Sequence, residues 1–144
     1  MKAAPNIERI VIFISRVEAL SEHNETVKQI EKIFRTNGFY TTREYPIFRI
    51  RNGSWRAGRI DLVARKGKYR VAIEYDHHML IKWKSFQKMV QIKPDVAIAI
   101  SGRGEMKPNF DRAIKYIKYL HSTLHVVTLK EKKYEIIKEV KSDE

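Results

Sequence analysis

Two short apolar runs, residues 58–64 and 71–76, stand on either side of a Lys-Gly-Lys turn signal at 66–68. Both runs are rich in β-branched residues and therefore predict two neighbouring strands of a tight hairpin. Three acids interrupt them: Asp61, Glu74 and Asp76. A carboxylate beside an apolar core is costly unless a cation or a metal ion compensates its charge. The hairpin therefore indicates a site of ion pairing or metal binding.

The spacing of the acids favours a metal site. Side chains two residues apart on a strand share a face, so Glu74 and Asp76 are expected to point the same way. Asp61 joins them if the register of the hairpin allows. Converging carboxylates are the hard oxygen ligands that Mg²⁺ or Mn²⁺ prefers. The residues thus predict a divalent-metal site.

The pattern also resembles that of a known family. The chain has an Asp in an apolar strand, then a turn, and then two apolar residues followed by Glu74, any residue and Asp76. This order is similar to the motif of the PD-(D/E)xK nuclease superfamily. This superfamily includes restriction-type endonucleases, Holliday-junction resolvases and very-short-patch-repair-like enzymes. The resemblance covers roughly residues 24–129. It implies an α/β fold with a restriction-endonuclease-like αβββαβ core, in which helices flank a mixed central sheet.

The resemblance also implies an activity, the metal-dependent hydrolysis of phosphodiester bonds in nucleic acid, with DNA favoured over RNA. In such a site Mg²⁺ or Mn²⁺ is held by Asp61, Glu74 and the backbone carbonyl of Tyr75, and the ion activates water and polarises the phosphate. The catalytic residues expected from the resemblance are Asp61, Glu74, Asp76 and Lys84.

The chain departs from the family at the catalytic lysine. The family commonly has Lys two residues after the Glu, where this chain has Asp76, followed by His77 and His78. Relatives similar to the very-short-patch-repair branch carry Glu-x-Asp with a nearby His, and others recruit a Lys from the next helix. We predict that Lys84 replaces the missing lysine, and that Asp76 binds metal or orients Lys84 or His78. The alternative interpretation is that Lys84, His77 and His78 are solvated side chains without a catalytic role.

A second departure concerns an acid that some relatives carry on the first helix of the core. With the chain aligned on Gly38, that position falls at Val27. Glu25 and Glu31 are near it but out of register, and Glu44 lies in the first predicted strand. Whether one of these acids joins the site stays open.

Each acid of the hairpin also has a structural interpretation. Asp61 can pair with Arg59 or Arg70 across the hairpin. Glu74 can form a buried salt bridge. Asp76 can cap the turn after its strand.

The charge of the chain favours a nucleic-acid partner. A net charge of +12 over 144 residues suits a phosphate-bearing partner, because each neutralised phosphate releases counterions. The basic residues are spread over several predicted elements, which favours nucleic acid over a membrane surface. A solvated sheet edge protected by charge is the alternative. The predicted contacts are Arg49, Arg51, Arg56, Arg59, Lys82 and Arg103.

The length predicts one domain over residues 1–144, and the resemblance implies that this domain is nuclease-like. Residues 1–21 form an extra N-terminal segment, 24–129 form the core, and 130–144 form a strand and a charged tail. A helix is expected over 7–20, and its apolar residues nearly encircle it, which predicts a homodimer contact.

Two further helices are expected from capping signals: one begins at a Ser21 or Asn24 cap and runs to Thr36, and another begins at an Asn109 cap. The chain has no apolar run of membrane-spanning length and no signal-peptide pattern, which predicts a cytosolic protein. It has no Cys, and its high Lys, Glu and Ile content is typical of thermophiles.

Three functions are therefore compared. The leading hypothesis is a metal-dependent nuclease. The alternative is a catalytically decayed protein of the same fold that binds nucleic acid without cleaving it. The third is a basic interaction or assembly subunit whose charge serves solubility or acidic partners.

Overall fold

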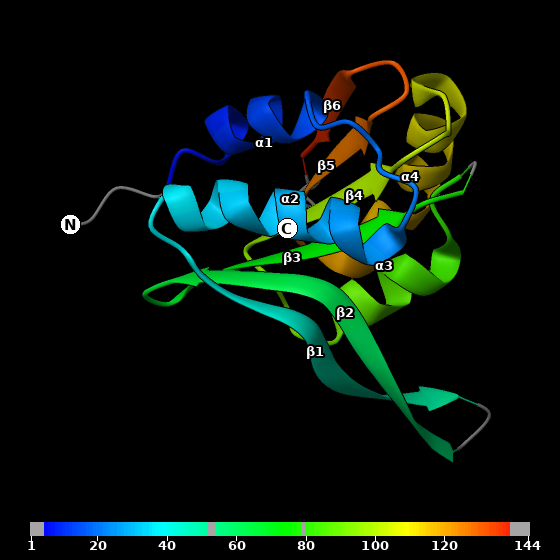
Figure 1. Cartoon of the computed structure of the whole chain (residues 1–144). Helices are drawn as coiled ribbons and strands as arrows, with labels where there is room; N and C mark the ends of the chain where they lie inside the picture. Colours follow the sequence, from blue (N-terminus) through cyan, green and yellow to red (C-terminus); the bar gives the residue numbers. More distant parts are fainter. Residues whose placement is uncertain (1–4, 52–53, 79, 139–144) are drawn as a thin grey trace.

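A computed structural model describes residues 5–51, 54–78 and 80–138, with the backbone alone at 49–51 and 54–57. Within these residues four helices flank a six-stranded mixed sheet, which confirms the predicted α/β class (Figure 1). The elements are α1 (Ile7–Ser15), α2 (His23–Thr36), β1 (Tyr40–Arg51), β2 (Ser54–Lys66), β3 (Tyr69–Asp76), α3 (Trp83–Val90), β4 (Val96–Ser101), α4 (Met106–Leu120), β5 (Thr123–Thr128) and β6 (Lys133–Ile137).

The strands lie in the order β1-β2-β3-β4-β5-β6. The first three form an antiparallel meander, β3, β4 and β5 are parallel, and β6 returns antiparallel to β5. Parallel neighbours need a crossover connection, and α3 and α4 provide the two crossovers. Every residue of β4 is buried, as expected for a central parallel strand covered on both faces.

Two cores form on opposite faces of the sheet. On one face, α1 and α2 pack Ile14 and Phe34 against Ile73 of β3. On the other face, α3 and α4 cover the small residues of β3 and β4, with Phe86 and Met89 fully buried (Figure 1). Odd-numbered residues at the centre of β3 therefore face α1 and α2, and even-numbered residues face α3 and α4.

The ends of three helices differ from the sequence-based expectation. Helix α1 ends at Ser15, whose hydroxyl donates to the Ile12 carbonyl, instead of continuing to residue 20. Helix α2 begins at His23, and neither predicted residue caps it. Helix α4 begins at Met106, because the fully buried Asn109 uses its amide elsewhere: it accepts from the Ile81 N–H and donates to the Glu105 carbonyl.

The apolar residues of α1 are mostly used within the chain. Ile7, Ile10, Val11 and Ile14 are buried in the core, and Phe13 is 42% exposed. The homodimer stays a prediction. Among the described helices, none combines the length and the apolar character needed to cross a bilayer.

His125 on β5 makes stability depend on pH. Its side chain is buried, its Nδ1 has no hydrogen-bond partner among the described residues, and burial lowers its pKa to about 4, although the charge of Glu8 opposes the shift. The unfolded chain binds this proton below about pH 6.5, so stability is full above that pH and is lost as pH falls toward 4. We expect this histidine to cost about 3 kcal/mol at pH 4 relative to pH 7. Urea unfolding of wild type and His125→Leu checks this, and an identical pH dependence of the two proteins would contradict it.

Candidate active site

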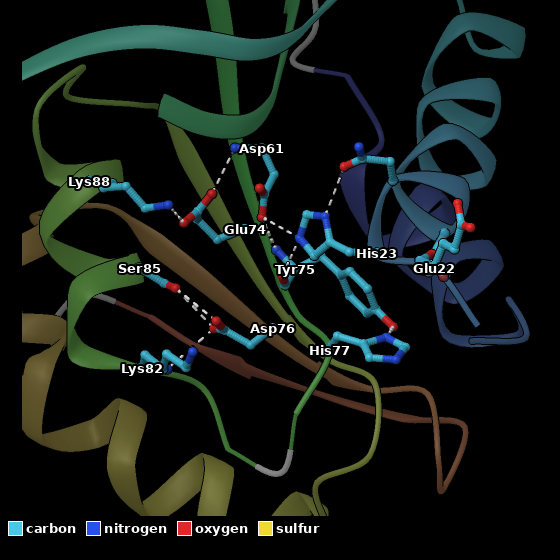
Figure 2. Close-up of polar contacts among 12 residues, drawn as sticks. Glu22, His23, Asp61, Glu74, Tyr75, Asp76, His77, Lys82, Ser85 and Lys88 are labelled. Carbon is cyan, nitrogen blue, oxygen red and sulfur yellow. Dashed lines mark hydrogen bonds and ion pairs between the residues drawn. The ribbon is translucent and has the colours of Figure 1, made fainter. Parts of the chain in front are cut away.

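The candidate site lies where β2 and β3 stop pairing. Their register runs from Lys66↔Tyr69 to Leu62↔Ile73, and the next two residues, Asp61 and Glu74, use their side chains instead. The Asp61 N–H donates to Glu74 Oε2 at 2.7 Å, and the Tyr75 N–H donates to Asp61 Oδ2 at 2.8 Å (Figure 2). Each carboxylate therefore satisfies a backbone donor of the opposite strand, a need that arises because the strands diverge.

Strand β1 is distorted at the same level. Pairing with β2 is regular at Arg43↔Leu62 and Tyr45↔Ile60, whereas Glu44 between them has a φ of 52°, in the left-handed region. Beyond this point β1 and β2 continue as a two-stranded ribbon that projects from the body of the protein (Figure 1). The two acids thus lie at the base of the ribbon.

Helix α3 places a lysine on Glu74. Lys88 Nζ lies 2.5 Å from Glu74 Oε1, and the exposed fraction of the Glu74 side chain is 2%. Burial, reinforced by the negative charge of Asp61, raises the pKa of Glu74 to about 8, against the opposing effect of Lys88. Glu74 is therefore a buried acid next to an ammonium group.

Helix α2 places a histidine on Asp61. His23 Nε2 lies 2.9 Å from the Tyr75 carbonyl oxygen and 3.4 Å from Asp61 Oδ2, and its Nδ1 lies 3.1 Å from Asn24 Oδ1. The hydrogen bond to Asp61 raises the pKa of His23 to about 9. Burial opposes ionisation of Asp61, but its bonds to His23 and to the Tyr75 N–H hold its pKa below the usual range. The two carboxyl groups of the site are therefore shifted in opposite directions.

Asp76 has a different set of partners. It accepts from Ser85 Oγ at 2.9 Å and from the Lys82 N–H at 3.2 Å, just before α3 begins (Figure 2). Burial raises its pKa, although these bonds oppose the shift. This is the capping arrangement of the structural alternative, and it ties the end of β3 to the start of α3.

The predicted catalytic residues line one pocket of about 340 Å³. Lys84 is exposed on its wall, whereas Lys88 makes the ion pair to Glu74. Within the described residues, no three His, Cys, Asp or Glu side chains are grouped to hold a metal ion. The pocket is lined by His23, Asp61, Glu74, Tyr75, Asp76, His77, His78, Lys82, Lys84, Ser85 and Lys88.

The other predicted basic residues are spread out. Lys82 lines the pocket, Arg59 is exposed and lies 3.7 Å from Glu44, and Arg103 lines a separate hollow of about 460 Å³. The side chains of three predicted arginines fall outside the described part of the chain: Arg49, Arg51 and Arg56.

The sequence leaves open whether Glu25, Glu31 or Glu44 joins the site, and the three acids have different surroundings. Glu25 pairs with Lys28 on the exposed face of α2, and Glu31 is bound by Arg43 and by the Thr41 hydroxyl. Glu44 borders a hollow of about 60 Å³ that is also lined by Asp61. Of these acids, Glu44 is therefore the one placed beside the site.

Sequence reasoning missed His23 and Lys88. Lys88 lies four residues after Lys84 and so occupies the same helical face, a signal that makes both lysines candidates. His23 precedes Asp61 by 38 positions, and no motif connects the two residues.

Comparison of the chain with protein-family models, with curated proteins and with solved structures gives no match. The functional assignment therefore depends on the geometry of the site.

Gly102 packs closely against Tyr75 and His77, two residues that line the site. A Cβ at this position would lie 2.5 Å from the hydroxyl oxygen of Tyr75, which bonds to His77 Nδ1 at 2.8 Å. We expect Gly102→Ala to destabilise the protein by roughly 1–3 kcal/mol through overpacking, as measured by urea unfolding. Tyr75→Phe removes the clashing oxygen, so the cost of Gly102→Ala should shrink in that background. Equal costs in both backgrounds would exclude this clash.

Proposed function

We propose that this chain is a metal-dependent nuclease that hydrolyses phosphodiester bonds, in DNA rather than RNA, on a restriction-endonuclease-like fold. The observation that carries the proposal is the meeting of Asp61, Glu74 and Lys88 in one pocket, from β2, β3 and α3. Two carboxylates and a lysine are the residue types of the PD-(D/E)xK motif that the sequence resembles. Here the lysine comes from the following helix.

The donor set fits Mg²⁺ or Mn²⁺. Asp61 Oδ2 and the Tyr75 carbonyl oxygen both lie within reach of one nitrogen of His23, so two hard oxygens already converge on one positive partner. Glu74 would supply the third oxygen. When bound, such an ion supplies an activated water and polarises the phosphate.

The protein groups around these oxygens suit phosphoryl chemistry. The Lys88 ammonium is held at the site by Glu74 and would stabilise negative charge on the phosphate oxygens. Lys82 and Lys84 on the wall would bind flanking phosphates. Asp76 holds the start of α3 and thereby keeps these lysines in place.

The shape of the molecule suits a duplex. The β1-β2 ribbon projects from the body of the protein (Figure 1), and Asp61, which lines the pocket, lies on its strand β2. A two-stranded ribbon fits the major groove of DNA. The net charge of +12 supplies affinity for nucleic acid that falls as the salt concentration rises.

A cytosolic location and a homodimer belong to the same proposal. Sedimentation equilibrium tests the dimer, and a monomer mass at high concentration would remove it.

Cleavage of a substrate panel tests the proposal. The panel contains single-stranded, duplex and four-way-junction DNA and an RNA strand, each with Mg²⁺, with Mn²⁺ or with EDTA. We expect cleavage of at least one DNA form that requires the metal. Binding without cleavage across the panel would contradict the nuclease.

A nucleic-acid-binding protein without catalysis is the second candidate. It is favoured by the way in which the acids are already bonded: His23 contacts Asp61, Lys88 contacts Glu74, and Ser85 contacts Asp76. Such a site is neutralised by the protein itself. This candidate predicts strongly salt-dependent binding and no cleavage with either metal.

A further inference from the structure

The ring of His23 lies against two oxygens that are candidate metal ligands. Its Nε2 faces two oxygens, the Tyr75 carbonyl at 2.9 Å and Asp61 Oδ2 at 3.4 Å, and its Nδ1 faces the side-chain oxygen of Asn24 at 3.1 Å. A carbonyl, a carboxylate and an amide oxygen only accept hydrogen bonds. The Nε2 of His23 therefore carries a hydrogen and donates it toward these two oxygens.

We propose that the Nε2–H group of His23 and a divalent cation are competing occupants of the position between Asp61 Oδ2 and the Tyr75 carbonyl oxygen. The inference rests on the proposed function, because it assigns a role toward the same ion. A protonated nitrogen has no lone pair for a metal, so His23 does not act as a ligand in this arrangement. It instead supplies the hydrogen-bond donor at the two oxygens that would otherwise bind the ion.

The surroundings of His23 allow its ring to leave this position. His23 is the first residue of α2, and 38% of its side-chain surface is exposed. Its ring packs on Tyr75 at a centroid distance of 5.2 Å and points toward Asp61 from the side of α2 (Figure 2). A rotation of this one side chain would expose both oxygens without moving either strand.

Two hollows next to the site are consistent with a displacement of the His23 ring. His23 and Asp61 line both the pocket of about 340 Å³ and the smaller hollow of about 60 Å³ beside Glu44. Both hollows therefore border the His23 ring and the Asp61 carboxylate.

Calorimetric titration of the full chain with Mn²⁺ tests the competition. Displacing a charge-assisted hydrogen bond weakens metal binding in the wild type, so we expect His23→Gln and His23→Ala to bind Mn²⁺ roughly tenfold more tightly. Lys28→Gln is the matched control, because it removes one positive charge from the exposed face of the same helix, where Lys28 pairs only with Glu25 among the described residues. Its Mn²⁺ affinity should equal that of the wild type. Amide spectra of each variant verify folding.

Weaker or unchanged Mn²⁺ binding in both His23 variants would overturn the competition. Asp61→Asn separates this failure from failure of the proposed function. If Asp61→Asn abolishes Mn²⁺ binding while the His23 variants bind no more tightly, the metal site stands and the competition is wrong. If Mn²⁺ binding is absent from the wild type or insensitive to Asp61→Asn, the metal site is wrong, and the competition falls with it.

Discussion

Glu74→Gln should lower metal-dependent cleavage by at least about 1,000-fold, because loss of a metal ligand removes several kcal/mol of transition-state stabilisation. The amide is close in shape to the carboxylate, and its oxygen can still accept from the Asp61 N–H. The variant should keep its fold but lose stability, because the amide NH2 group then faces Lys88 Nζ, and its DNA affinity should change little. Cleavage rates and fluorescence anisotropy of the same labelled DNA measure the two effects.

Glu25→Gln is the control for this substitution. Glu25 is an exposed acid of α2 that pairs with Lys28, and its replacement removes the same charge away from the pocket. We expect this variant to cleave like the wild type. Full cleavage by Glu74→Gln would remove Glu74 from the mechanism.

Lys88→Met should destabilise the protein in a pH-dependent way. The pKa of Glu74, raised by burial to about 8, lies above its unfolded value, so its contribution to stability is full below about pH 4.5 and is lost as pH rises through 8. Without Lys88 that pKa rises further. The variant should therefore lose about 2 kcal/mol more than the wild type between about pH 6 and pH 9.5, measured by urea unfolding.

Lys84→Met distinguishes the two lysines of α3. Lys84 is exposed, so its replacement should change stability by less than about 0.5 kcal/mol at either pH. Lys88→Met should also reduce cleavage, because its ammonium group is the one at Glu74. If Lys84→Met abolishes cleavage and Lys88→Met does not, the lysine predicted from the sequence is the catalytic one.

The sheet and the acids of the site could be predicted from the sequence for a common reason. A β-branched run and a Lys-Gly-Lys turn specify a hairpin locally, and an acid inside such a run is conspicuous because its burial is costly. The observed register places Leu62 opposite Ile73, which brings Asp61 and Glu74 next to each other.

The partners of the acids depend on tertiary packing. Periodicity places Lys84 and Lys88 on one helical face, and only the packing of α3 on the sheet selects Lys88. His23 reaches Asp61 because α2 covers the same face as the Tyr75 ring. The sequence predicts Asn109 as a helix cap. Its side-chain oxygen instead accepts a hydrogen bond from the N–H of Ile81, which is 28 residues away in sequence.

We propose that Asp61 and Glu74 form a metal-dependent phosphodiesterase site. The most direct measurement is the cleavage of labelled duplex and four-way-junction DNA in Mn²⁺ by the wild type beside Asp61→Asn, with EDTA as the blank. Wild-type cleavage that stops in EDTA and in Asp61→Asn is the predicted result. Equal cleavage by both proteins, or binding by both with no cleavage, would contradict it.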